Sequence, residues 1–523
     1  MRGAGPSGLG IACQIHPKLA RHPMHHDTPR EIDCAWLLPD PGAQAPQADM
    51  RIRIDADGRI AGIAPIGSAA AGRRLLAMPA LSNAHDHGRT FRSATLGAYD
   101  KPLESWLPFN GVVPGLDPYL CAATSFARSV RHGVANLMVH YTRVQGGMPY
   151  VEEARHVARA ARDVGVRIGF AVVMRDRNGI GYEGDAAVLR ALRPGIRDAV
   201  AGRLAAKSAA PAQQIHQVDE VAQMLRDGGF DANVTAQYGP AAVQWCSTPL
   251  LEAIARASAD TGRPVHMHCL ETPYQRAWAD RHHPQGMLRF LDDIGLLSPR
   301  LTLAHCAHAR PDELALLAER GVTIAVNTSS NLYLKSGIAP VQEMLRQGCR
   351  VAMGLDGTGF DEDDDALREM RVAYMLHRGW GFDTRMTRQQ LWAFAGGNGP
   401  RSVSGAGAIA TGRLQAGAPA DLVLLDWDAL DDDALFDDVD PMDLLLARAN
   451  GSHVARVMVG GRSVVEAGRV TGIDEAALRA ELVARARAAL AADPRHGEWL
   501  QTLRALAQDL GPYYLEGAQG CCG

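Results

Sequence analysis

Hydrophobic positions in the middle of the chain alternate between short strand-like runs and longer helix-like stretches. Eight runs have the length and apolar content of buried strands, and they cover residues 75–81, 134–140, 166–173, 232–237, 264–268, 301–305, 322–327 and 351–356. Helical patterns follow several of them, for example at residues 249–261 and at residues 311–320, where a proline begins the helix and a glycine follows its end. Strands that alternate with helices predict a parallel sheet with crossover helices. Eight such units favour an α/β fold of the closed (β/α)8 or TIM-barrel type over an open sheet.

Shorter strand patterns separated by turns flank this region on both sides. Near the start they read C-A-W-L-L, M-R-I-R-I and R-I-A-G-I-A-P, and near the end G-R-L-Q-A-G-A-P-A-D-L-V-L-L-D and V-A-R-V-M-V-G-G-R-S-V-V. We expect these two pieces to pair into one small β domain built from both ends of the chain.

Four segments follow from these patterns. The expected segments are a disordered leader at residues 1–30, a composite β-sandwich of residues 31–78 and 406–472, a TIM barrel at residues 79–405 and a helical extension at residues 473–523. The leader leaves open whether translation starts at Met1 or at Met24. The amphipathic pattern that begins after Asp474 predicts a helix that serves packing and has no part in function.

Composition narrows the class of partner. The 523 residues are 47% hydrophobic and 21% charged with a net charge of -4, which is typical of a globular protein. Basic residues are scattered among acids, which argues against nucleic acid or an anionic membrane as partner and favours a small-molecule substrate. The nine cysteines form no C-x-x-C pair, and no apolar run approaches the roughly 18 to 20 residues that span a bilayer. We therefore expect a cytoplasmic protein.

Histidines follow the first and fifth predicted strands. The segment A-H-D-H-G-R places His85 and His87 two positions apart, so that both imidazoles can face one metal ion. The segment R-P-V-H-M-H-C-L-E-T carries His266 and His268, with Glu271 in the turn that follows. We interpret His268 as a possible third ligand, Glu271 as a proton carrier beside it, and His266 as a buried histidine bonded to a carbonyl group.

The sixth and eighth predicted strands end in two further polar residues. His305 closes L-T-L-A-H, and Asp356 closes V-A-M-G-L-D before a glycine. A carboxylate at the end of an apolar strand is costly to bury unless it is paired or bound to a cation. TIM-barrel enzymes assemble their active sites at the carboxyl ends of the strands. The four motifs together therefore predict a metal-dependent active site at that end.

The order of these motifs closely resembles that of the amidohydrolase superfamily, in its branch with cytosine and guanine deaminases, S-adenosylhomocysteine deaminase and the atrazine chlorohydrolase-like triazine hydrolases. The resemblance runs from about residue 32 to about residue 470. It implies His85, His87, His268 and Asp356 as metal ligands and Glu271, His305 and Asp356 as catalytic residues. Binuclear members usually carry a carboxylated lysine or a glutamate on strand four, where this chain reads V-T-A-Q-Y-G-P. The resemblance thus implies one divalent metal per chain, Zn²⁺ or Fe²⁺.

A mechanism follows from these residue types. A metal held by imidazoles and a carboxylate lowers the pKa of a bound water, so that hydroxide is available near neutral pH. Asp356 can take the water proton, His305 can polarise the attacked centre, and Glu271 can protonate the substrate nitrogen and then the leaving amine.

Four other residues are candidates for substrate contacts. Trp106 follows strand one, His140 ends strand two, Gln237 ends strand four and Trp245 lies beyond it. The Gln237 amide could bind a heterocycle edge and a tryptophan could stack on its ring, although each of the four could equally serve packing.

The leading hypothesis is hydrolytic deamination of an aminated N-heterocycle, namely a purine, pyrimidine, pterin or triazine. Hydrolysis of an amide, urea or carbamate with the same metal site is the alternative, and a catalytically silent relative is a remote one. A homodimer or a higher homo-oligomer is possible. The motifs do not identify the substrate or the native metal.

Overall fold

The centre of the molecule is a parallel barrel of eight strands. The computed structural model describes residues 31–67, 74–177, 179–204, 208–357, 359–405 and 412–515. The barrel strands are β5 (Leu81–Asp86), β6 (Val134–Tyr141), β7 (Arg167–Met174), β8 (Val234–Pro240), β9 (Val265–Cys269), β10 (Leu301–His305), β11 (Thr323–Val326) and β12 (Arg350–Met353), and each is bonded to the next in this order. The amides of Leu355 and Asp356 donate to the His85 carbonyl oxygen at 3.2 and 3.0 Å, which joins the last strand to the first. The predicted (β/α)8 barrel is confirmed.

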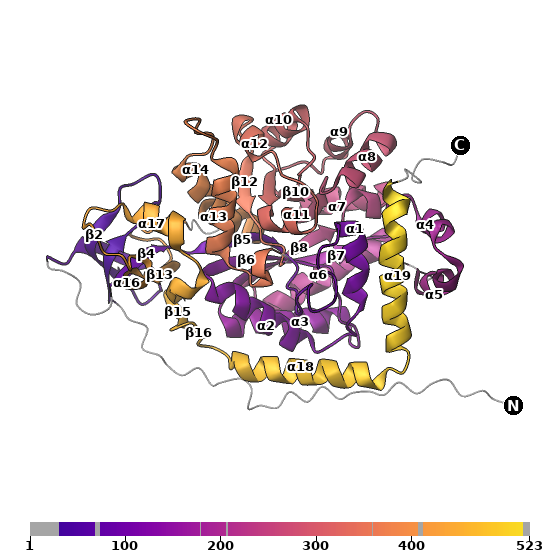
Figure 1. The fold of residues 1–523 in the computed structure, drawn as a ribbon, viewed down its shortest axis with the longest axis horizontal. Helices are drawn as coiled ribbons and strands as arrows, with labels where there is room; N and C mark the ends of the chain where they lie inside the picture. Colours follow the sequence, from indigo (N-terminus) through magenta and orange to yellow (C-terminus); the bar gives the residue numbers. More distant parts are fainter. Residues whose placement is uncertain are drawn as a thin grey trace.

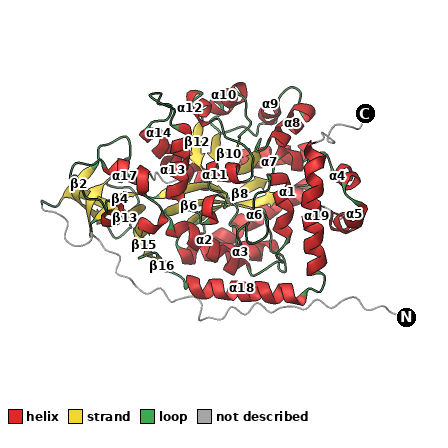
Figure 2. Cartoon of the chain, viewed as in Figure 1, coloured by secondary structure: helices red, strands yellow, loops and turns green. Residues whose placement is uncertain are grey.

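Helices surround the barrel and cover its strands from outside (Figure 1, Figure 2). Every residue of β6 and of β10 is buried, as expected for parallel strands that are covered on both faces. The helices up to the barrel's end are α1 (Leu103–Trp106), η1 (Leu107–Gly111), α2 (Pro118–Arg131), α3 (Tyr150–Val164), α4 (Asp185–Ala191), α5 (Pro194–Leu204), α6 (Pro211–Asp227), α7 (Thr248–Thr261), α8 (Pro273–His282), α9 (Met287–Asp293), α10 (Pro311–Glu319), α11 (Thr328–Tyr333), α12 (Val341–Arg346), α13 (Ala366–His377), α14 (Arg388–Trp392) and α15 (Gly399–Ser404).

Local sequence signals set the ends of these helices. In α7 the Ser247 hydroxyl accepts a hydrogen bond from the Leu250 amide at 3.2 Å, and Gly262 ends the helix with a φ of 72°. The α7 and α10 helices therefore lie within one or two residues of their predicted bounds.

A second sheet of eight strands is built from residues before the barrel and residues after it. Its order is β16 (Arg469–Val470), β15 (Arg462–Glu466), β14 (Val454–Val459), β13 (Leu422–Asp426), β4 (Leu75–Pro79), β1 (Glu31–Leu37), β2 (Gln47–Ile54) and β3 (Ile60–Pro65). The antiparallel pairing of β13 with β4 joins the two halves, and α16 (Trp427–Leu430) and α17 (Pro441–Arg448) follow β13. The expected β domain from both chain ends is present as one mixed sheet.

The first barrel strand begins later than the sequence pattern indicates. Residues 75–79 form β4 of the mixed sheet, and the barrel strand β5 starts at Leu81. Only Ala80 separates the two strands, and every residue from 76 to 86 is buried. Because the apolar run L-L-A-M-P-A-L continues from β4 into the first residue of β5, hydrophobicity alone gives no sign of the boundary between the two strands.

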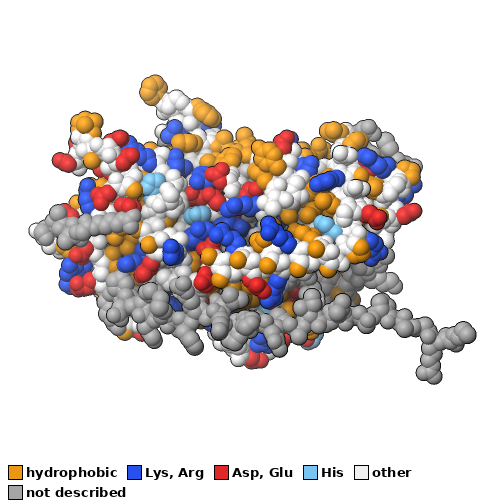
Figure 3. Space-filling model, turned by 60° about the horizontal axis from the view of Figure 1, so that its bottom comes forward, with side chains coloured by type: hydrophobic (Ala, Val, Ile, Leu, Met, Phe, Trp, Pro, Cys, Tyr) orange, Lys and Arg blue, Asp and Glu red, His pale blue; other side chains and the backbone are white. Residues whose placement is uncertain are grey.

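Two helices complete the described chain. Helix α18 (Glu475–Ala492) packs on α2, where Arg131 forms an ion pair with Glu475 at 3.2 Å. The chain then turns sharply, and α19 (His496–Leu515) runs past α1, α4 and α5 (Figure 1). Acidic and basic side chains lie side by side on the face shown in Figure 3. No helix among the described residues is long and apolar enough to cross a membrane. The proposed leader at residues 1–30 lies outside the described residues.

Candidate metal centre and active-site cavity

Four donor atoms from three strand ends converge in the barrel. The Nε2 atom of His87 lies 3.2 Å from the Nε2 atom of His268 and 3.2 Å from Oδ1 of Asp356, and His85 Nε2 lies 3.6 Å from the same carboxylate oxygen. A tetrahedral zinc site with bonds of about 2.0 to 2.2 Å places its ligand atoms about 3.3 to 3.6 Å apart. His85 Nε2 is also buried without a hydrogen-bond partner among the described residues. The donor set fits one zinc-sized ion.

Hydrogen bonds to the outer ring nitrogens orient these imidazoles. His87 Nδ1 donates to the His140 carbonyl oxygen at 2.8 Å, and His268 Nδ1 donates to the Ala241 carbonyl oxygen at 2.7 Å. Each bond fixes the tautomer that leaves the Nε2 lone pair facing the centre. Burial lowers the pKa values of His85, His87 and His268, so that the rings are neutral and able to bind a metal.

His266 does not occupy the environment expected for it. Its Nε2 atom shares a hydrogen bond of 2.8 Å with His85 Nδ1, and the two rings stack with centroids 5.0 Å apart. The expected bond to a carbonyl group is therefore wrong, because β5 and β9 bring the two rings together inside the barrel. His266 supports the metal-facing orientation of His85.

Asp356 and His305 both have backbones in the left-handed region, with φ of 59° and 75°. Such strained conformations in residues other than glycine concentrate at functional sites. Ser330 Oγ donates to Asp356 Oδ2 at 2.7 Å, and Arg89 Nη2 donates to Oδ1 at 3.2 Å. Burial by itself raises the pKa of Asp356, but the Arg89 guanidinium and the imidazole of His87 outweigh it and hold the pKa well below its ordinary value. The carboxylate is thus held ionised.

The two other predicted catalytic groups face each other. His305 Nε2 lies 3.6 Å from Glu271 Oε2, and His305 Nδ1 is bonded to Asn331 Oδ1 at 2.9 Å. Ser336 Oγ donates to Glu271 Oε1 at 3.3 Å. Burial raises the pKa of Glu271 to about 7, which suits a group that exchanges protons near neutral pH.

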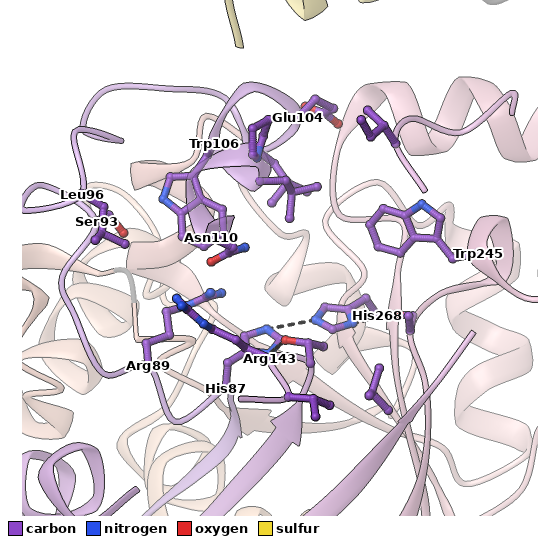
Figure 4. Close-up of a pocket in the computed structure, with 18 of the residues that line it drawn as sticks. His87, Arg89, Ser93, Leu96, Glu104, Trp106, Asn110, Arg143, Trp245 and His268 are labelled. Atoms are coloured by element: carbon purple, nitrogen blue, oxygen red, sulfur yellow. Dashed lines mark hydrogen bonds between the residues drawn. The ribbon is translucent and has the colours of Figure 1, made fainter. Parts of the chain in front are cut away.

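A cavity of about 620 Å³ opens above this cluster. His87, His268, Glu271, His305 and Asp356 lie at its inner end. Trp106 and Trp245, two of the predicted substrate contacts, line opposite sides of it above His87 and His268 (Figure 4). The Arg89 guanidinium lies 4.4 Å from the centre of the Trp106 ring.

The two other predicted substrate contacts lie outside the cavity. Gln237 is buried, and its amide donates to the carbonyl oxygens of Ser402 and Val403 in α15, both at 2.8 Å. The ring of His140 lies behind the cluster, with its centroid 4.8 Å from that of His268 and Nε2 bonded to the Gly239 carbonyl oxygen at 3.0 Å. Neither residue lines the cavity, so these two expectations do not match the geometry.

Sequence reasoning missed several residues of the cavity wall. Glu104 is buried, accepts hydrogen bonds from Thr272 Oγ1 at 2.6 Å and Tyr182 at 2.8 Å, and has an Oε2 atom with no partner among the described residues. The one sequence feature that could have indicated Glu104 is its position two residues before Trp106, a predicted substrate contact. Helix α19, which belongs to the helical extension expected at residues 473–523 and for which no site residue was predicted, also lines the cavity.

The barrel, the mixed sheet and the buried donor cluster define a hydrolase with a metal-capable centre at the carboxyl ends of its strands. The chain belongs to the amidohydrolase family, which residues 76–464 match. It is 30% identical over 467 residues to the 5-methylthioadenosine/S-adenosylhomocysteine deaminase of Natronomonas pharaonis, a match that covers 85% of this chain and 98% of the relative. It is 31% identical over 249 residues to the 5'-deoxyadenosine deaminase of Methanosarcina barkeri, covering 47% of this chain and 56% of the relative.

Solved structures share the fold. An adenosine deaminase from Xanthomonas campestris with bound zinc has a TM-score of 0.69 at 23% identity, covering 91% of this chain and 98% of that chain. The atrazine chlorohydrolase of Arthrobacter aurescens TC1 complexed with zinc and atraton has a TM-score of 0.68 at 21% identity, covering 87% of this chain and 99% of that chain. The family match and the deaminase relatives confirm the resemblance to this branch of the superfamily, and these structures share its fold.

Proposed function

We propose that this protein is a zinc-dependent, cytoplasmic aminohydrolase that deaminates an aminated N-heterocycle. The observation that carries the proposal is the donor group of His85, His87 and Asp356, with His268 Nε2 3.2 Å from His87 Nε2. Of these residues His87, His268 and Asp356 line the cavity, together with Glu271. The deaminases among the relatives support the reaction class and favour an adenine nucleoside as substrate. The described cysteines are all buried and free, which fits a reducing compartment.

In this proposal His85, His87, His268 and Asp356 hold one divalent metal. The metal supplies activation of water at neutral pH when it is bound. Asp356, ionised and next to the centre, accepts the proton of the attacking water. Fe²⁺ would suit the same mixture of nitrogen and oxygen ligands.

Glu271 and His305 act on the substrate. Glu271 donates its proton to the ring nitrogen next to the attacked carbon. It then takes the hydroxyl proton of the adduct and delivers it to the leaving amine, so that the carbonyl forms, the C–N bond breaks and ammonia departs; the proton held by Asp356 restores the acid form of Glu271. His305, whose Nδ1 atom is bonded to Asn331 Oδ1, polarises the attacked centre. Trp106 and Trp245 stack on the heterocycle from the two sides of the cavity.

Release of ammonia from protein loaded with zinc tests the proposal. The panel contains aminated purines, pyrimidines, pterins and triazines beside amides, ureas and carbamates, and mass spectrometry records the product. We expect exchange of an amine for a carbonyl oxygen in a heterocycle, with about one metal per chain. Turnover of the acyclic compounds alone would replace the proposal by amide, urea or carbamate hydrolysis. Silence across the whole panel at full metal loading would favour a catalytically silent protein.

A further inference from the structure

Helix α19 forms one wall of the active-site cavity. The residues that line it are Trp499, Leu503, Leu506, Leu510 and Tyr514. Their spacing of three or four places them on one face of the helix. The match to the amidohydrolase family ends at residue 464, so that this wall comes from a part of the chain beyond the match.

Hydrogen bonds and an ion pair hold this wall against the loops that follow two barrel strands. Ser105 Oγ donates to the Ala507 carbonyl oxygen at 2.9 Å, and Trp499 Nε1 donates to the Gly111 carbonyl oxygen at 3.1 Å. Near α5, Arg193 Nε donates to Asp509 Oδ1 at 2.9 Å. Because both sides are tied down, α19 is a fixed part of the cavity wall.

The chemistry of this wall contrasts with that of the inner end. Leu503, Leu506 and Leu510 are only 2%, 3% and 1% exposed, and the Tyr514 ring packs on that of Tyr182 at 5.5 Å. No residue by which α19 lines the cavity is charged. The cavity is therefore polar where the metal ligands lie and apolar along α19, apart from Glu104, which accepts a hydrogen bond from Tyr182 beside Tyr514.

Three arginines also line the cavity, but each is engaged elsewhere. Arg89 is bonded to Asp356, Arg143 donates to main-chain carbonyl groups of residues 113 and 114, and Arg175 lies 5.4 Å from the centre of the Trp245 ring. None of these three arginines is therefore available to pair with an anionic substituent that binds against α19.

The cavity has room for more than a bare heterocyclic ring. At about 620 Å³ the cavity lies within the range of roughly 300 to 1,000 Å³ that is typical of sites for drug-sized ligands. We propose that α19 binds an apolar substituent of the substrate, remote from the reacting amine, and so selects heterocycles with such a substituent over the bare ring and over those with a charged tail. This inference rests on the proposed deaminase function.

A series of probes that share the adenine ring tests this inference. The probes are adenine, adenosine, 5'-deoxyadenosine, 5'-methylthioadenosine and S-adenosylhomocysteine, and both kcat/KM for ammonia release and calorimetric binding are measured with zinc-loaded protein. One missing methylene in an apolar pocket changes selectivity by about tenfold or more. We expect wild-type protein to prefer 5'-methylthioadenosine over adenosine and over S-adenosylhomocysteine by at least about tenfold.

Matched variants on the same helix locate the preference. Leu506→Ala and Leu510→Ala should each reduce the preference for 5'-methylthioadenosine over adenosine by about tenfold, in kcat/KM and in binding. Leu515→Ala is the control, because Leu515 is on the same helix and is 76% exposed. Leu506→Met, which conserves volume, should keep the preference and covers the case in which an alanine variant fails to fold.

The outcomes separate the two proposals. Deamination of the probes with the same preference in wild type and in the Leu506 and Leu510 variants would overturn the role of α19 and leave the proposed function intact. Binding that prefers the apolar probe and depends on α19, without ammonia release, would overturn the deaminase function and support the wall. Neither binding nor turnover of any probe would overturn both for this class of substrate.

Discussion

Replacing Glu271 by glutamine removes the proposed proton donor with little change in volume. The carboxyl group is buried, lies 3.6 Å from His305 Nε2 and accepts a hydrogen bond from Ser336 at 3.3 Å, which a glutamine carbonyl can also accept. We therefore expect an intact fold and unchanged metal content in Glu271→Gln. General acid–base catalysis contributes about 10²- to 10⁴-fold to a rate, or about 3 to 5.5 kcal/mol in the activation free energy. The expected loss of kcat is of that size.

The pH profile gives a second measure of the same role. Burial raises the pKa of Glu271 to about 7, and the acid form is the one that donates a proton. The fraction in that form, and with it kcat, should fall as pH rises through about 7. Glutamine does not titrate in this range, so the residual activity of the variant should lose this decline.

The matched control is another buried carboxyl group. Burial also raises the pKa of Glu369 to about 7, but this residue accepts a hydrogen bond from the Ser329 amide and does not line the cavity. Glu369→Gln should retain nearly full kcat. A Glu271→Gln enzyme with more than about a tenth of wild-type kcat, or one that has lost its metal, would refute the assignment.

Three further predictions concern other parts of the molecule. His268→Ala should lower the bound zinc from about one equivalent per chain to a small fraction of it, measured by elemental analysis after dialysis; full occupancy would contradict the proposed ligand set. Gln237→Ala should reduce the free energy of unfolding by about 1 to 3 kcal/mol, because it leaves two buried carbonyl groups of α15 without donors, and should leave KM unchanged. A changed KM with unchanged stability would restore Gln237 as a substrate contact. Burial raises the pKa of Glu369 from 4.5 to about 7. The contribution of this group to stability is therefore present below about pH 4.5 and is lost as pH rises through 7. The melting temperature should fall less between pH 5 and pH 8.5 in Glu369→Gln than in wild type. The difference in unfolding free energy should approach about 3 kcal/mol, and parallel profiles would contradict it.

The barrel and the polar residues at the ends of its strands could be predicted without a structure. Parallel strands that are buried on both faces must be apolar, so the runs near residues 134–140 and 301–305 were visible without a structure. Polar residues at the ends of such runs, such as His87, Glu271 and Asp356, stand out because burying them needs a compensating partner. Because the strands are parallel, their carboxyl ends lie at the same end of the barrel, which brings these residues to one rim.

Contacts between residues that are far apart in the chain could not be predicted in this way. The boundary between β4 and β5 is invisible in the sequence, because the apolar run of residues 75–81 continues from one strand into the next. The bond between His85 and His266 and the position of Gln237 against α15 depend on which strands face each other inside the barrel. Likewise, the apolar face of α19 looks like ordinary packing in the sequence, and its place beside the cavity depends on the direction in which the chain turns after α18. Local spacing determines which face of an element is apolar, whereas the packing of distant elements determines what that face contacts.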